Sequence, residues 1–134
     1  MAVSPDLSVD IGGLKIKNPV LAASGTFGYG DELTPFFDPS NLGAIIVKGL
    51  SLRPIPGNLP PRTVETPCGM LNAIGLANIG IDAFLEEKLP SLVAIDTPII
   101  TNIYGRTVTE YGEMAKRIEG VDGIAALEVN ISCL

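Results

Sequence analysis

Four polar side chains each follow directly on a short apolar run, which is the pattern in this sequence with the most chemical content. The runs are VLAA, AIIV, PIIT and ALEV, and the side chains that follow them are Ser24, Lys48, Asn102 and Asn130. If the runs lie side by side and point the same way, a hydroxyl, a cation and two amides converge at one edge. Such a group could bind a polar ligand.

A fifth candidate is the thiol of Cys133, which ends the segment VNISC. The chain has no histidine, so Ser-His-Asp and Cys-His nucleophile systems are excluded from it. A cysteine without histidine can act as a general base when nearby donors or cations lower its pKa from about 8.5. Cys68 and Cys133 show no metal-ligand spacing, so we expect two free thiols and no metal site.

The elements that must position these groups are buried parallel strands. Each run is rich in Val, Ile, Leu or Ala and too short for a helix. Helical patterns lie between the runs, which predicts an α/β fold of the parallel β/α barrel (TIM) type, with catalytic groups at the carboxyl ends of the strands. Because side chains alternate along a strand, the expected pairs on a common face are Ser24 with Ala22, Lys48 with Ile46, Asn102 with Ile100, and Asn130 with Glu128.

The segments between the strands carry their own signals. Residues 7–17 predict a β-hairpin with a Gly-Gly turn that closes the barrel floor. Asp31 begins an irregular first helix that ends near Asn41. A second helix begins near Asp82 and is broken by Pro90. Thr107 caps a third helix, which has one apolar face. That face consists of Tyr111, Met114, Ala115 and Ile118.

Residues 49–80 form a long segment dense in proline and glycine, which we interpret as an ordered active-site loop over the strand ends. Cys68 lies within it and is expected to be a structural thiol under the loop. Arg53 and Arg62 are expected to pack the loop or face solvent. The glycines of GTFGYGDEL suggest a phosphate loop only superficially, since neither GK[ST] nor G-x-G-x-x-G is present.

Length and composition bound the fold. The 134 residues fit a single domain over 1–134, and 46% hydrophobic with 5% aromatic residues suits a Val/Ile/Ala-built core. A complete barrel takes about 250 residues, so four β/α units make a partial barrel with open edges that favour homo-oligomers. A net charge of −6 without a basic cluster argues against nucleic acid. Without a signal peptide or a membrane-length apolar run, a cytoplasmic protein is expected.

Four segments together carry a specific resemblance to a known family. They are NPVLAASGTFGYG, IIVKGLSLRPIPGNLPPR, ETPCGMLNAIGLANIG and VNISC, and they span most of the chain. They resemble class 1 dihydroorotate dehydrogenase, and residues 48–80 resemble the NAD-linked catalytic subunit of subclass B. The resemblance implies an FMN-containing barrel that oxidises dihydroorotate to orotate in de novo pyrimidine (UMP) biosynthesis. It also implies a partner subunit that carries an iron-sulfur cluster and FAD.

The resemblance also assigns roles to residues of this sequence. Cys133 would be the base that removes the C5 proton of dihydroorotate while hydride leaves C6. FMN would contact Ser24, Lys48, Gly49, Asn102 and Asn130. The substrate would contact Lys48, Asn72, Ala73, Ile74, Gly75, Leu76 and Asn130. Orotate presents an alternating N–H and C=O edge, and an asparagine amide carries a donor and an acceptor in one plane, which suits it to read that edge.

The sequence departs from the family pattern at Leu134, where the family has proline, and later strands are not part of the chain. We therefore expect the 134-residue chain alone neither to hold FMN tightly nor to turn over. Two alternatives stay open. One is an FMN barrel that acts on another pyrimidine, and the other is a non-catalytic half-barrel module that only self-associates.

Overall fold

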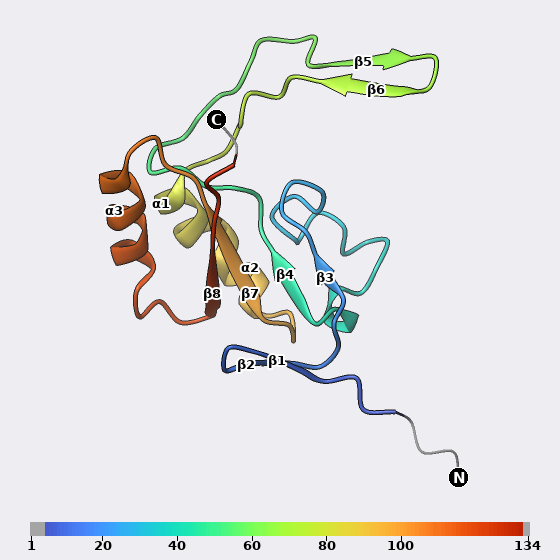
Figure 1. The fold of residues 1–134 in the computed structure, drawn as a ribbon, viewed down its shortest axis with the longest axis vertical. Coiled ribbons are helices and arrows are strands. Elements are labelled where there is room, and N and C mark those ends of the chain that lie inside the picture. Colours follow the sequence, from blue (N-terminus) through green and yellow to red (C-terminus); the bar gives the residue numbers. More distant parts are fainter. Residues whose placement is uncertain (1–4, 133–134) are drawn as a thin grey trace.

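The centre of the fold is a four-stranded parallel sheet (Figure 1). The computed structural model describes residues 5–132. The strand order is β3 (Leu21–Ala22), β4 (Ala44–Ile46), β7 (Ile99–Ile103) and β8 (Ile124–Val129), and all neighbours are parallel. All four predicted strands are therefore confirmed, and their carboxyl ends share one edge of the sheet.

The two faces of the sheet bury different sets of residues, as the alternation of side chains along a strand requires. Toward the helices lies the main core, with Ile45, Val47 and Ile99 packed against Phe84 and Met114. On the opposite face a smaller cluster is made by Ile16, Ala44 and Ile100, with Leu14, Leu21, Ile46 and Ala126 beside it. Because Ile46 and Ile100 lie on this second face, Lys48 and Asn102 follow onto it two residues later.

The predicted N-terminal hairpin is present as β1 (Val9–Ile11) and β2 (Leu14–Ile16). Gly12 and Gly13 form its turn with φ of 60° and 99°, values that suit glycine. Ile16 is 2% exposed and packs with Ala44 and Ile100. The hairpin thus covers the amino end of the sheet face that leads up to the strand tips.

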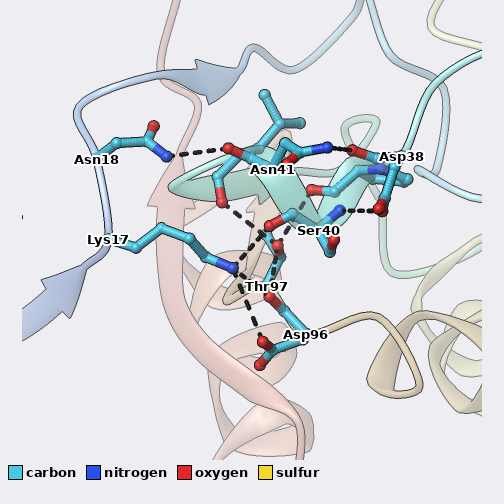
Figure 2. A network of polar contacts seen from close by, with 9 residues as sticks. Lys17, Asn18, Asp38, Ser40, Asn41, Asp96 and Thr97 are labelled. Carbon is cyan, nitrogen blue, oxygen red and sulfur yellow. Dashed lines mark hydrogen bonds and ion pairs between the residues drawn. The ribbon is translucent and has the colours of Figure 1, made fainter. Parts of the chain in front are cut away.

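A network around Lys17 fastens the amino ends of the strands (Figure 2). The Lys17 ammonium donates to the carbonyl oxygens of Ser40 and Asp96 at 2.6 and 2.7 Å. The Asn18 amide donates to the Asn41 carbonyl, so both residues after the hairpin hold η1 (Pro39–Asn41), a single 3₁₀ turn. Lysine near a helix C-terminus satisfies carbonyls that have no partner within the helix. The network therefore fixes where β4 and β7 begin.

The first predicted helix is absent, since residues 31–37 form turns and bends and only η1 is helical in this segment. The prediction of a helix from Asp31 to Asn41 was wrong. Proline disfavours helical geometry in the residue before it. Asp38, which precedes Pro39, is extended with φ −83° and ψ 103°, and its carboxylate caps η1 through Ser40 N–H.

The second predicted helix is present but is not broken at Pro90. It runs through α1 (Ile81–Ala83), η2 (Phe84–Lys88), a π-helical turn, and α2 (Leu89–Val93). The Leu89 N–H donates to the Phe84 carbonyl five residues back, which is the π pattern. Pro90 then stands at the start of α2, where a missing N–H costs little.

The third predicted helix is confirmed as α3 (Val108–Ile118). The Thr107 side chain accepts from the Glu110 N–H, and the Glu110 carboxylate accepts from Arg106 N–H. Met114 and Ile118 are buried, as the predicted apolar face requires. The Tyr111 hydroxyl donates to the Asn130 carbonyl, so α3 also holds the chain just after β8.

Residues 49–80 are not a plain loop. They contain a β-hairpin, β5 (Thr63–Thr66) and β6 (Gly69–Asn72), which stands away from the sheet beyond its carboxyl edge (Figure 1). Arg62 packs the loop, as predicted, by donating to the carbonyl oxygens of Pro56 and Asn58. Cys68 is exposed at the hairpin turn, so the prediction of a thiol under the loop was wrong.

The ion pair between Asp31 and Lys88 predicts a pH-dependent contribution to stability. Burial raises the pKa of Asp31, but hydrogen bonds with Lys88 and Glu32 and the Lys88 charge outweigh it, and the net pKa is lowered from 3.8. A lowered folded-state pKa stabilises the fold above the unfolded value, and the contribution is lost as the pH falls through the folded pKa.

We expect Lys88→Met to lower the free energy of unfolding by up to about 1 kcal/mol at pH 7, because the pair is only partly buried. The difference between the variant and the wild type should shrink as the pH falls from 7 through the lowered folded-state pKa of Asp31, because Asp31 then becomes protonated. Urea unfolding at pH 7 and pH 3 measures the difference in the free energy of unfolding. Lys116→Met, on the exposed face of α3, is the control. An equal difference at both pH values contradicts the assignment.

Candidate functional site

The strand ends surround a cavity of about 160 Å³. Its walls are Ser24, Gly25, Lys48, Gly49, Leu76, Asn102 and Asn130. Six of these seven residues were predicted as site residues from the sequence, and only Gly25 was not. The structure therefore brings together the four polar groups that follow the apolar runs, at the carboxyl edge where the barrel pattern places them.

Three of the four polar groups reach the cavity by the alternation of their strands. Lys48 and Asn102 continue the face of Ile46 and Ile100, and Asn130 continues the face of Glu128. Lys48 is also held by its backbone, since its N–H donates to the Gly28 carbonyl at 2.8 Å. This backbone hydrogen bond therefore fixes the position of Lys48 in the cavity wall.

Ser24 reaches the cavity by a different route from the predicted one. Ala22 pairs with Ile45 and packs in the core on the helix side, so Ser24 does not share its face by alternation. The strand ends at Ala22, and a turn closed by Thr26 N–H to the Ala23 carbonyl redirects the chain. The prediction of shared strand parity was wrong for this pair, because the backbone is no longer extended at Ser24.

Glu128 links two of the four polar groups, Ser24 and Asn102, which the sequence did not reveal. Its Oε1 accepts a hydrogen bond from the Ser24 hydroxyl at 2.7 Å and another from Asn102 Nδ2. Asn102 Nδ2 also lies 3.3 Å from Ser24 Oγ. The sequence indicated an inward glutamate without naming a partner. Its partners are two of the candidate site residues themselves.

The oxygen of the Asn102 amide, unlike its nitrogen, has no hydrogen-bond partner within the described residues. Asn102 is 1% exposed, and its Oδ1 accepts no hydrogen bond from the part of the chain that the structure describes. A side chain on Gly49 would place its Cβ 2.8 Å from this oxygen. Glycine at this position therefore avoids a clash with the buried acceptor, which a side chain would cause.

The predicted substrate residues 72–76 belong to the segment that returns from the β5–β6 hairpin, and most of them lie outside the cavity. Asn72 and Ala73 are exposed, and Ala73 N–H donates to the Arg62 carbonyl. Ile74 and Gly75 pack against Asn58, with Gly75 at φ 74°. Leu76 alone of this group reaches the cavity. Cys133, the predicted base, lies outside residues 5–132.

Asn78 is a buried residue that sequence reasoning missed. Its Oδ1 accepts from Ser51 N–H, Ser51 Oγ and Gly80 N–H, and its Nδ2 donates to the Leu76 carbonyl. These bonds anchor both ends of the long segment and hold Leu76 beside the cavity. The only hint in the sequence was the repeated asparagine in NAIGLAN, where Asn72 is exposed and Asn78 is 8% exposed.

Two backbone amides of the glycine-rich segment after β3 already have an anionic partner. The Glu32 carboxylate accepts from Tyr29 N–H and Gly30 N–H, each at 3.0 Å. A carboxylate of the chain itself thus occupies these two donors. Residues 5–132 also hold no cluster of three or more acidic, Cys or His side chains suited to a metal ion. Among the same residues no helix has the length and apolar character needed to span a bilayer.

Comparisons with known proteins point to one family. The family model described as dihydroorotate dehydrogenase matches residues 6–134. The catalytic subunits of dihydroorotate dehydrogenase B (NAD(+)) from Geotalea daltonii and Geotalea uraniireducens are 62% and 60% identical over 129 residues. Each match covers 96% of this chain and 42% of the relative, so the chain spans less than half the length of these proteins.

A solved structure agrees on the fold. The crystal structure of DHODH from Eimeria tenella in complex with ferulenol superposes with a TM-score of 0.69 at 23% identity. The superposition covers 96% of this chain and 37% of that one. This likeness supports the partial β/α barrel, and the family match confirms the resemblance drawn from the four sequence segments. The chain belongs to the dihydroorotate dehydrogenase family.

Proposed function

We propose that the protein oxidises dihydroorotate to orotate, with FMN as the hydride acceptor, in de novo pyrimidine biosynthesis. The observation that carries this proposal is the meeting of Ser24, Lys48, Gly49, Asn102 and Asn130 around one cavity in a member of this family. These are the residues that the family resemblance assigns to FMN. Their convergence requires four neighbouring strands that point the same way, so chance placement is a poor explanation.

The groups around the cavity fit the polar edge of a flavin ring. Asn102 supplies a buried acceptor without a partner, Gly49 leaves space in front of it, and Lys48 supplies a cation. FMN, when bound, supplies the hydride acceptor. Lys48 would stabilise negative charge that develops on the ring as hydride arrives. Ser24 and Asn130 would orient the ring.

The substrate would lie against the residues that return from the hairpin. We propose that Asn72, Ala73, Ile74, Gly75 and Leu76, together with Lys48 and Asn130, contact it. Amide side chains suit its alternating N–H and C=O edge. Cys133 would accept the C5 proton, a role that requires its thiolate form. Residues 49–80 would then act as an active-site loop that excludes water.

We also propose two kinds of protein partner. The relatives from Geotalea are named as catalytic subunits of an NAD(+)-linked enzyme, which supports a separate electron-transfer subunit. The family resemblance is the basis for proposing that this subunit carries FAD and an iron-sulfur cluster. Self-association is supported by the sheet edge, where Leu127 and Val129 of β8 are 37% and 55% exposed. Apolar residues on an unpaired edge strand favour association with another copy.

The test uses an extended protein, which we define as residues 1–134 joined to the part of the Geotalea daltonii relative that the match does not cover. We expect it to retain FMN, and dihydroorotate added without oxygen should bleach the flavin absorbance. The 134-residue chain alone should do neither. Stoichiometric flavin on the chain alone, or an extended protein whose flavin ignores dihydroorotate, contradicts the proposal.

Experiments on the extended protein and on the 134-residue chain also distinguish the proposed function from two alternatives. An FMN barrel for another pyrimidine would bind uracil in preference to orotate, and the amides of the site would suit either ring. A half-barrel module without catalysis is favoured only by the exposed β8 edge, and it would form flavin-free dimers in sedimentation experiments. Binding of orotate in preference to uracil by the extended protein excludes the first alternative, and reduction of its flavin by dihydroorotate excludes the second.

A further inference from the structure

We propose that Glu128 is a positioning residue that fixes the amide of Asn102 in one orientation. In that orientation Asn102 Oδ1 accepts a hydrogen bond from a ring N–H in the cavity. The inference rests on the proposed function, because the ring is taken to be a flavin or a dihydropyrimidine. It adds a residue to which the family resemblance gave no role.

The orientation follows from the chemistry of the groups in contact. An ionised carboxylate has acceptors only, whereas an amide side chain has a donor end and an acceptor end. Glu128 Oε1 receives both the Ser24 hydroxyl and Asn102 Nδ2. With the amide reversed, Asn102 Oδ1 would face the carboxylate oxygen without a proton between them. Glu128 therefore selects the orientation that turns Oδ1 away from itself.

In the selected orientation the Asn102 Oδ1 is an acceptor that a ligand could satisfy. Asn102 is 1% exposed, and no residue within 5–132 donates to its Oδ1. Buried acceptors rarely stay unpaired in native proteins. Gly49 has no side chain to cover this oxygen, and both residues line the cavity. An N–H from a bound ring is the partner that these observations indicate.

A register shift in the sheet places Glu128 for this task. Ile99 pairs with Ile124, but Ile100 pairs with Ala126, so Ala125 is an extra residue in β8. Asn102 consequently lies directly opposite Glu128. Without the shift Leu127 would stand there, since a slip of one residue exchanges the two faces of a strand. Bulges often re-aim a side chain near an active site.

Two ligands offer the required N–H, and the test separates them. The flavin ring carries an N3–H, and the dihydroorotate and orotate rings carry N–H groups as well. The affinities of the extended protein are measured for FMN, 3-methyl-FMN, orotate and 3-methylorotate. Each 3-methyl compound lacks the N3–H donor of its parent, so it reports on a hydrogen bond from that donor. If replacement of Glu128 weakens the binding of orotate but not of FMN, the hydrogen bond is assigned to the substrate.

The variants are Glu128→Met, which removes the acceptor at similar size, and Glu128→Gln, whose amide oxygen still accepts. If the flavin supplies the N–H, wild type should bind 3-methyl-FMN at least about tenfold more weakly than FMN, the effect of one hydrogen bond. If the substrate supplies it, the same difference should separate 3-methylorotate from orotate. E128M should bind FMN, or orotate, about tenfold more weakly and lose the discrimination, because its Asn102 amide is free to rotate. E128Q should stay within about threefold of wild type. E113M, on exposed α3, is the matched control.

The inference is overturned if E128M binds FMN and orotate as wild type does and still discriminates against 3-methyl-FMN. If neither Glu128 variant folds, the wild type decides, since less than twofold discrimination against both 3-methyl-FMN and 3-methylorotate overturns it. An extended wild-type protein that binds neither FMN nor orotate overturns the proposed function and this inference together. Binding by the wild type with no effect of E128M overturns the inference alone.

Discussion

Asn102→Asp is expected to lower the free energy of unfolding of the chain by about 3 kcal/mol at pH 7. The substitution keeps the size of the side chain but sets a second carboxylate against Glu128 Oε1, where Asn102 Nδ2 now donates. The site is almost completely buried, with Asn102 at 1% exposure. Two carboxylates at hydrogen-bond distance in such a place repel each other and lose a donor.

Urea unfolding followed by circular dichroism measures the effect. Asn72→Asp adds the same charge on exposed β6, and there the free energy should change by less than about 0.5 kcal/mol. A loss below about 1 kcal/mol for Asn102→Asp would mean that Asn102 and Glu128 are not in contact in solution. Glu128 could then not fix the orientation of the Asn102 amide.

Lys48→Met is expected to slow flavin reduction by dihydroorotate about 100-fold in the extended protein. Among the residues that line the cavity, Lys48 is the single cation. A preorganised donor at a position of developing charge typically contributes a factor of about 100 to 1,000 in rate. Methionine keeps the length and the apolar stem, so the loss reports on the charge and its protons.

Stopped-flow absorbance under anaerobic conditions gives this rate directly. Lys116→Met on exposed α3 has the same chemistry far from the cavity, and its rate should match the wild type. Flavin content must be measured for each variant, because Lys48 also contacts the cofactor in the proposal. A reduction rate for Lys48→Met within about threefold of the wild type would remove Lys48 from the proposed chemistry.

The sequence correctly predicted which side chains reach the cavity at those strands where the alternation of side chains alone decides their direction. For β4 and β7, counting two residues from Ile46 and Ile100 correctly placed Lys48 and Asn102. For Ser24 the same count failed, because the chain turns at Ala23 and tertiary hydrogen bonds take over. The partner of Glu128 could not be predicted, since it depends on the extra residue Ala125.

The connecting segments were harder to predict than the sheet. Prolines predicted a loop over residues 49–80, but the β5–β6 hairpin within it is exposed on both faces and so has no hydrophobic alternation to reveal it. Pro90 predicted a helix break, which a π turn avoids by moving the hydrogen bonds one residue back. In both places backbone pairing, which leaves little trace in composition, decided the structure.

The most direct test of the assembled site is a crystal structure of the extended protein with FMN and orotate. The flavin edge should lie within hydrogen-bond distance of Lys48 Nζ and Asn102 Oδ1, with Gly49 beneath it. Cys133 should face the pyrimidine ring from the same end of the strands. A flavin bound elsewhere, with Lys48 and Asn102 facing only water, would contradict the site.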